Sequence, residues 1–243
     1  MKTRRKPSMI LFDYGLTLIQ EPDFDPLRGD RALLPYITKN KNGISVEEIS
    51  AFARRAFLEA EPARAAGFEV HEHMLLRLLN DSLGLEYSIT IEEQERIFWE
   101  NASTFVPMPN IEQLLDYLNI VGIRTAVVSN ISFSGKALKR RIDAALPRNR
   151  FEFVIASSDY GVRKPSPRIF QVALQKAGVL PEDAWFCGDN FDADITGAAK
   201  AGIFPVWYRG GSESKSVDDE KNGVTDLLMI HDWQELIEKL NRE

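Results

Sequence analysis

The stretch Met9-Ile10-Leu11-Phe12-Asp13-Tyr14-Gly15-Leu16-Thr17-Leu18-Ile19 decides the fold of this chain. Its first four residues are an uninterrupted apolar run, the pattern of a strand buried on both faces of a parallel sheet. Asp13 follows directly, which predicts a single carboxylate at the carboxyl end of that strand. Gly15 allows the backbone to turn sharply there and expose its amides. The hydroxyl of Thr17 falls within reach of the same place and is a candidate substrate contact.

Composition and charge exclude several classes of protein. The chain of 243 residues is 44% apolar and 27% charged, as soluble globular proteins are, and its net charge of -6 argues against a nucleic-acid surface. The basic run at residues 2–6 is expected to be a solvated tail. No segment approaches the ~18 uncharged apolar residues of a membrane span. The single cysteine, Cys187, suits a reducing compartment, so we expect a cytoplasmic protein.

Residues 20–104 differ in pattern from the first strand. Apolar residues recur at helical spacing almost throughout, and this predicts an all-helical domain inserted after the strand. His71 and His73 fall between two of its helices and are expected in a surface loop, since no third zinc ligand is near. Pro107 and Pro109 end the helical pattern and mark the return to the first domain.

From residue 105 onward, strand and helix patterns alternate. The predicted strands are residues 123–130, 151–156, 184–187 and 203–208, with a short apolar run at 227–230, and the predicted helices are residues 111–118, 136–145, 167–177 and 195–201, with a last one capped by Asp232. This alternation predicts an α/β protein with a doubly wound parallel sheet, formed by residues 1–19 and 105–243. The segment 210–216 resembles a phosphate loop only loosely, because it lacks the glycine before the lysine, and is expected to be a surface loop.

Polar residues end several of the predicted strands, where chemistry is found in sheets of this kind. They are Asp13 after the first strand, Ser129 and Asn130 after the second, Lys164 in the loop after the third, and Asp189 and Asp194 after the fourth. Carboxylates that converge without a cation raise one another's pKa. The group therefore predicts a magnesium-type cation. Ser129, Asn130 and Lys164 are candidate contacts for a phosphoryl group of the substrate.

Four motifs, in order along the chain, resemble those of the haloacid dehalogenase-like (HAD) hydrolase superfamily, in the branch with a helical cap between the first two motifs. They are residues 12–18, 127–130, 161–165 and 188–198, the last in its form of Gly-Asp, four residues and Asp. The resemblance implies that Asp13 attacks phosphorus and forms an aspartyl-phosphate, which water later hydrolyses. It also implies that residues 20–104 close over the site as a cap and choose the leaving group.

The resemblance further implies a set of ligands. Mg²⁺ would be held by Asp13, the backbone carbonyl of Gly15 and Asp189, with Asp194 either as a further ligand or as a support for the ligands. Ser129 and Lys164 would bind the phosphoryl oxygens, and the positive charge of Lys164 would also offset the carboxylates.

The residue two positions after the predicted nucleophile departs from the family pattern. Phosphatases of this family usually carry a second aspartate there, as the acid that protonates the leaving oxygen and then activates water, but this chain has Gly15. A positioned acid or base contributes roughly 10²–10⁴-fold, so we expect slow turnover unless the leaving group is good or another acid takes over. Glu21, Asp23 and Asp25 are near in the sequence, although a solvated linker is the simpler interpretation of all three.

Three other functions stay open beside a magnesium-dependent phosphatase for a small phosphorylated metabolite. A haloacid dehalogenase, whose aspartate attacks carbon, does not need the paired aspartates of the last motif. A phosphonate-cleaving hydrolase also lacks the second aspartate but requires an inserted lysine for a Schiff base, and residues 20–104 contain only Lys39 and Lys41. A catalytically weak protein of this fold could serve as a binding or regulatory module. No motif marks the natural substrate or the oligomeric state.

Overall fold

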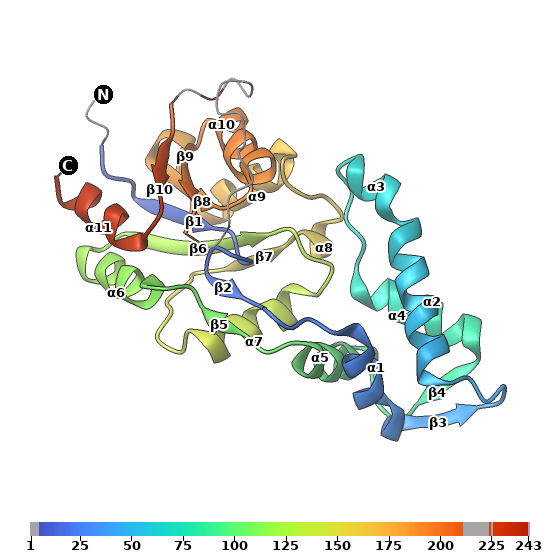
Figure 1. The fold of residues 1–243 in the computed structure, drawn as a ribbon. Helices are drawn as coiled ribbons and strands as arrows, with labels where there is room; N and C mark the ends of the chain where they lie inside the picture. The colour runs from blue at the N-terminus through green and yellow to red at the C-terminus, as the bar shows by residue number, and fades with distance from the viewer. Residues whose placement is uncertain (1–4, 211–223, 225, 243) are drawn as a thin grey trace.

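The computed structural model describes residues 5–210, 224 and 226–242, so the predicted loop at 211–216 and the first residues of the basic tail lie outside the described residues. Six parallel strands form one sheet in the order β10-β9-β8-β1-β6-β7 (Figure 1). Their bounds are β1 Met9–Phe12, β6 Arg124–Ser129, β7 Val154–Ala156, β8 Ala184–Gly188, β9 Phe204–Tyr208 and β10 Leu228–Ile230. The predicted α/β class and parallel sheet are confirmed.

Helices cover both faces of the sheet because the side chains of β1 alternate between two apolar clusters. Ile10 and Phe12 pack with α6, α7 and α11, whereas Met9 and Leu11 pack with α9 and α10. The helices of this region are α6 Ile111–Val121, α7 Gly135–Ala145, α8 Ser157–Tyr160, α9 Pro167–Ala177, α10 Gly197–Lys200 and α11 Trp233–Arg242. The predicted helix at 195–201 is divided, since residues Phe191–Thr196 form a π-helix and only the remainder is α-helical.

Residues 20–104, called the insert below, lie to one side of the sheet in Figure 1. Their helices are α1 Pro26–Leu33, α2 Val46–Glu59, α3 Glu61–Ala65, α4 Glu72–Leu83 and α5 Ile91–Ala102, with a 3-10 turn at Leu34–Tyr36. The insert is not all-helical as predicted, because β3 Ile37–Asn40 and β4 Leu85–Tyr87 pair as an antiparallel ribbon. Both strands are too short to show a period-2 pattern in the sequence.

The two ends of the insert lie side by side. β2 Ile19–Gln20 pairs antiparallel with β5 Val106–Pro107.

His71 and His73 are half-buried rather than in a surface loop, which corrects the prediction. The Nε2 atom of His71 lies 3.4 Å from Asp159 of α8, and that of His73 lies 2.9 Å from Glu95 of α5. The start of α4 thus packs against both α5 and the main sheet domain.

Two carboxyl groups of the insert, those of Asp30 and Glu72, lie where the charged form is disfavoured. Asp30 is 7% exposed, and its Oδ2 has no hydrogen-bond partner among the described residues. Burial, with the nearby charges of Glu95 and Asp30, raises the pKa of Glu72 to about 8. Burying a carboxyl group of this kind favours its neutral form.

We predict that Glu72→Gln stabilises the protein above neutral pH. Between the ordinary pKa of 4.5 and about 8, the unfolded chain releases a proton that the folded chain keeps, so wild-type stability falls as pH rises through this window. The variant lacks this loss and should gain roughly 1–3 kcal/mol at pH 8 and nothing at pH 4. Urea unfolding at the two pH values measures the difference.

Glu59→Gln is the matched control, because Glu59 is an exposed glutamate on α2. An equal response of both variants to pH would contradict the assignment.

None of the helices in the described part of the chain is long and apolar enough to span a bilayer.

Candidate active site

Four charged side chains meet at the carboxyl ends of β1 and β8. Lys164 Nζ lies 2.6 Å from Asp13 Oδ1 and 2.6 Å from Asp194 Oδ1. Asp13, Asp189 and Asp194 each offer a carboxylate oxygen, and these oxygens all lie within 4.8 Å of one another. Lys164 is 2% exposed, Asp13 8% and Asp194 1%. The structure therefore brings together four residues that are up to 181 positions apart in the chain, from Asp13 to Asp194.

The glycine before Asp189 makes this approach possible. Gly188 ends β8, and a Cβ atom there would collide with the side chain of Asp194. The backbone N–H of Asn190 donates to Asp194 Oδ2 at 3.0 Å, while Asn190 Oδ1 accepts from Ala193 N at 2.9 Å. The turn from β8 into the π-helix thus fixes Asp194 against the strand end.

The charges at this place do not balance. Burial followed by the charges of Asp13 and Asp194 raises the pKa of Asp189 to about 7, although Lys164 opposes the shift. Burial also raises the pKa of Asp194, again against Lys164. Burial alone would lower the pKa of Lys164, but Asp13 and Asp194 outweigh it and raise that pKa. One ammonium therefore faces three carboxylates.

This donor set fits a hard divalent cation. Carboxylate oxygens are the ligands that Mg²⁺ prefers, and Mg²⁺ takes one or two of them together with water and phosphate. A divalent metal ion beside Lys164 would also reduce the excess negative charge that raises the pKa of Asp189. The acidic group can thus hold a metal ion on chemical grounds.

Two predicted substrate contacts are placed differently. The side-chain amide of Asn130 bonds the backbone of Lys164, donating to its carbonyl at 2.9 Å and accepting from its N–H at 2.7 Å. Asn130 therefore positions Lys164, and it also lines the cavity described below, so its contact with substrate stays a prediction. Thr17 is fully buried, and its hydroxyl lies 3.5 Å from Asp189 Oδ1. Thr17 is not among the residues that line the cavity described below, and its hydroxyl faces Asp189.

A cavity of about 590 Å³ opens above the charged group. Asp13, Gly15, Ser129 and Lys164 line its floor together with Asp189 and Asp194. This volume lies in the range of small-molecule sites. Ser129, at the end of β6, is 3% exposed and contributes a hydroxyl where the phosphoryl contact was expected.

Aromatic residues that the sequence did not single out form another wall of the cavity. Tyr14, Phe24, Trp99 and Phe133 line it, and Trp99 of α5 stacks on Phe133 with ring centroids 4.0 Å apart. The insert thus supplies part of the wall. The helical spacing around Trp99 marked an apolar face, but it could not show that this face meets residue 133.

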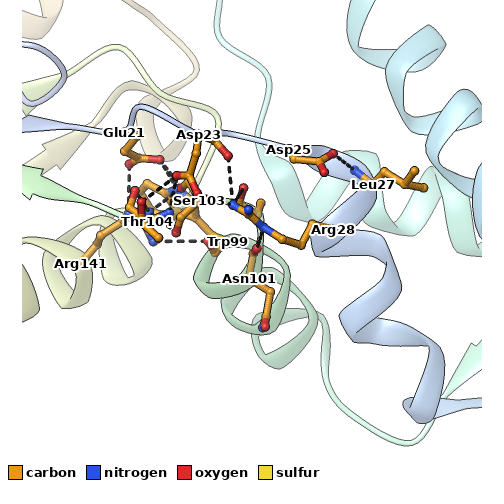
Figure 2. Close-up of polar contacts among 11 residues, drawn as sticks. Glu21, Asp23, Asp25, Leu27, Arg28, Trp99, Asn101, Ser103, Thr104 and Arg141 are labelled. Carbon is orange, nitrogen blue, oxygen red and sulfur yellow. Dashed lines mark hydrogen bonds and ion pairs between the residues drawn. The ribbon is translucent and has the colours of Figure 1, made fainter.

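Glu21 is not a solvated linker residue. Its Oε1 accepts from Tyr14 Oη at 2.6 Å and from Arg141 Nε at 3.0 Å, and its Oε2 accepts from Trp99 Nε1 at 3.1 Å and Ser103 Oγ at 2.6 Å (Figure 2). Four donors hold this carboxylate, so it is engaged in structure and poorly placed to protonate a leaving group.

Asp23 and Asp25 are also engaged in structural contacts (Figure 2). Asp23 Oδ1 accepts from the backbone N–H and the hydroxyl of Thr104 at 2.8 and 2.7 Å, and these bonds help to lower its pKa to about 2. Asp25 is the N-cap of α1 and accepts from Leu27 N at 3.0 Å. Neither is a candidate for the missing acid.

Sequence comparison assigns the family. Residues 30–202 match the model for haloacid dehalogenase-like hydrolases, which covers more than half of the chain. The chain belongs to the haloacid dehalogenase-like hydrolase family. A glyceraldehyde 3-phosphate phosphatase of Pyrococcus furiosus is 29% identical over 98% of this HAD hydrolase and 95% of its own length. A phosphoglycolate phosphatase of Aquifex aeolicus is 31% identical over 65% of this chain and 74% of its own.

Solved structures show the same fold. The 2-haloacid dehalogenase from Pseudomonas syringae pv. Tomato DC3000 matches this HAD hydrolase with a TM-score of 0.63 at 22% identity, over 96% of this chain and 98% of the other. At this identity the likeness concerns the fold alone. The choice between chemistries therefore depends on the residues of the site.

We predict that Arg141→Met strongly destabilises the protein. The guanidinium of Arg141 is buried, pairs with Glu21 and donates to the backbone carbonyls of Trp99 and Ser103 at 3.3 and 3.0 Å. Removing one partner of a buried pair leaves the other charge uncompensated and costs about 3–5 kcal/mol. Denaturant unfolding measures the loss. The neighbouring Arg140 is exposed, so Arg140→Met is the control, and equal effects of the two variants would contradict the prediction.

Proposed function

We propose that this HAD hydrolase is a magnesium-dependent phosphatase that acts on a small phosphorylated metabolite through an aspartyl-phosphate on Asp13. The observation that carries the proposal is the meeting of Asp13, Lys164, Asp189 and Asp194 on the floor of one cavity. A phosphoryl group needs an oxygen nucleophile and positive charge around its equatorial oxygens. The names of the two phosphatase relatives support the same reaction class.

Each residue has a part in this mechanism. Lys164 holds one oxygen of Asp13 at 2.6 Å, which orients the carboxylate and leaves its other oxygen to attack phosphorus. Ser129 and Lys164 bind the equatorial oxygens of the phosphoryl group. Bound Mg²⁺, held by Asp13, the carbonyl of Gly15, Asp189 and Asp194, supplies charge neutralisation of the phosphoryl oxygens.

The insert serves as a cap in this proposal, and residues 1–19 and 105–243 form the catalytic domain. Trp99 of the insert lines the cavity above the nucleophile, where the leaving group of the substrate would lie. Exclusion of water by such a wall strengthens the electrostatic contacts to the phosphoryl group.

Gly15 limits the leaving groups that the enzyme can expel. The three nearby carboxylates are held in structural contacts, so no general acid stands in the usual position of the family. An alkoxide that departs without a proton needs a low pKa of its own. We therefore propose fast turnover for activated esters and slow turnover for simple alkyl phosphates.

The site favours this function over the alternatives. A dehalogenase has no use for the third carboxylate, Asp189, beside Lys164. For a phosphonate-cleaving enzyme, neither Lys39 nor Lys41 lines the cavity, and Lys39 pairs with Glu86 on the β3–β4 ribbon. A binding module remains the second candidate because Gly15 replaces the acid, and the assay below separates it.

The first test is phosphate release from a panel of phosphomonoesters that includes p-nitrophenyl phosphate. We expect release with Mg²⁺, its loss on addition of EDTA, and a decrease of at least about 10³-fold in kcat for Asp13→Asn, because the nucleophile is removed. Thermal unfolding shows whether the variant is folded. Equal inactivity of wild type and variant across the panel would overturn the phosphatase function and favour the binding module.

A second test restores the missing acid. A Cβ atom added at Gly15 meets no atom within 4 Å, and Gly15 lines the cavity, so we expect Gly15→Asp to be accommodated. We expect it to raise kcat on alkyl phosphates by about 10- to 10³-fold and to change kcat on p-nitrophenyl phosphate far less. Gly15→Asn has the same shape without the proton and is the control. No gain for the aspartate variant over the asparagine variant would mean that another group already supplies the acid.

A further inference from the structure

A second cation lines the cavity beside Lys164. Arg163 and Lys164 are the two basic residues among the described residues that line it. The mechanism above uses Lys164 and leaves Arg163 without a part. The backbone of Arg163 is fixed, since its N–H donates to the carbonyl of Gly67 in the insert at 3.1 Å and its carbonyl accepts from Ser166 N at 3.0 Å.

The guanidinium of Arg163 is oriented but only partly compensated. Its Nε lies 3.7 Å from Glu69 Oε2, too far for a hydrogen bond, and the side chain is 20% exposed. Neither Nη atom donates a hydrogen bond to any residue in the described part of the chain. Burial lowers the pKa of Arg163, and the charge of Glu69 opposes this shift.

The charge of Glu69 is not available to Arg163 in full, because Glu69 also has other partners. Glu69 Oε1 accepts from Arg64 Nε at 3.2 Å, and Glu69 Oε2 accepts from Ser157 Oγ at 2.8 Å. Arg64 also pairs with the exposed Glu61 at 3.1 Å. The buried carboxylate of Glu69 is therefore shared between two arginines. Arg163, the one of the two that lines the cavity, has Nη atoms without a hydrogen bond to any described residue.

We propose that Arg163 binds a carboxylate of the substrate, on the leaving-group side of the phosphoryl group held by Asp13 and Lys164. The two Nη atoms present parallel N–H donors that match the two oxygens of a carboxylate. The substrate class is then small phosphorylated carboxylic acids. This assignment rests on the proposed phosphatase function and adds to it a residue that determines specificity.

The test compares phosphoglycolate with its neutral amide, phosphoglycolamide, in the presence of Mg²⁺. The quantity measured is the ratio of kcat/KM for acid over amide, and comparing this ratio between variants cancels the difference in leaving group. We expect wild type to prefer the acid and Arg163→Gln to lower the ratio about 10- to 100-fold. Arg163→Lys keeps the positive charge but lacks the two parallel N–H donors, and it should give an intermediate ratio.

Arg64→Gln is the matched control. It removes the other arginine from Glu69 but does not line the cavity, so the acid-to-amide ratio should stay within about twofold of wild type. A wild-type ratio near one, or an equal fall of the ratio in the Arg64 and Arg163 variants, would overturn the assignment.

Calorimetric binding of the same two compounds to Asp13→Asn separates this inference from the proposed function. Tighter binding of the acid that is lost in Asp13→Asn/Arg163→Gln supports Arg163 even if wild type hydrolyses neither compound, in which case the phosphatase function fails alone. Hydrolysis of both compounds without a preference in rate or binding leaves the phosphatase function standing and overturns the role of Arg163.

Discussion

The site depends on the ammonium of Lys164, which lies between Asp13 and Asp194 at 2.6 Å from each. The carboxylates of the buried Asp13 and Asp194 and of the half-buried Asp189 repel one another, and the cation offsets this repulsion at the carboxyl ends of β1 and β8. The side-chain amide of Asn130 bonds both the N–H and the carbonyl of Lys164. The position of the cation is therefore set by the end of β6. The same arrangement orients Asp13, the proposed nucleophile, and leaves an excess of negative charge that suits a divalent cation.

A second ion pair joins the half-buried Glu21, at the start of the insert, to the buried Arg141 of α7. Glu21 receives bonds from Tyr14, which is next to Asp13, from Trp99 and Ser103 of the insert, and from Arg141 of α7. The guanidinium also lies 4.8 Å from the Trp99 ring centroid. The proposed cap is therefore joined to the catalytic loop through polar contacts that a change in either part would disturb.

The cavity wall has an aromatic side and a positively charged side, and in the proposed function each contacts a different part of the substrate. The aromatic side, with Tyr14, Trp99 and Phe133, excludes water from the leaving group. The positive charge on the wall comes from Arg163, which lies beside Glu69 of the insert. In the proposed mechanism Gly15 supplies no acid, so binding of the leaving group has to contribute more to the rate.

The sequence alone determined the sheet, the order of strands and helices around it, and the residues on the cavity floor, because the apolar run before Asp13 and the strand-ending polar residues are local patterns with a regular period. It did not reveal the β3–β4 ribbon, whose strands are too short for a pattern. Only the tertiary structure decided that Thr17 and Asn130 contact protein groups, that Glu21 pairs with Arg141, and that Arg163 lines the cavity. Each of these depends on which residue lies opposite, at separations from 34 to 172 positions along the chain, and such pairing is set by packing.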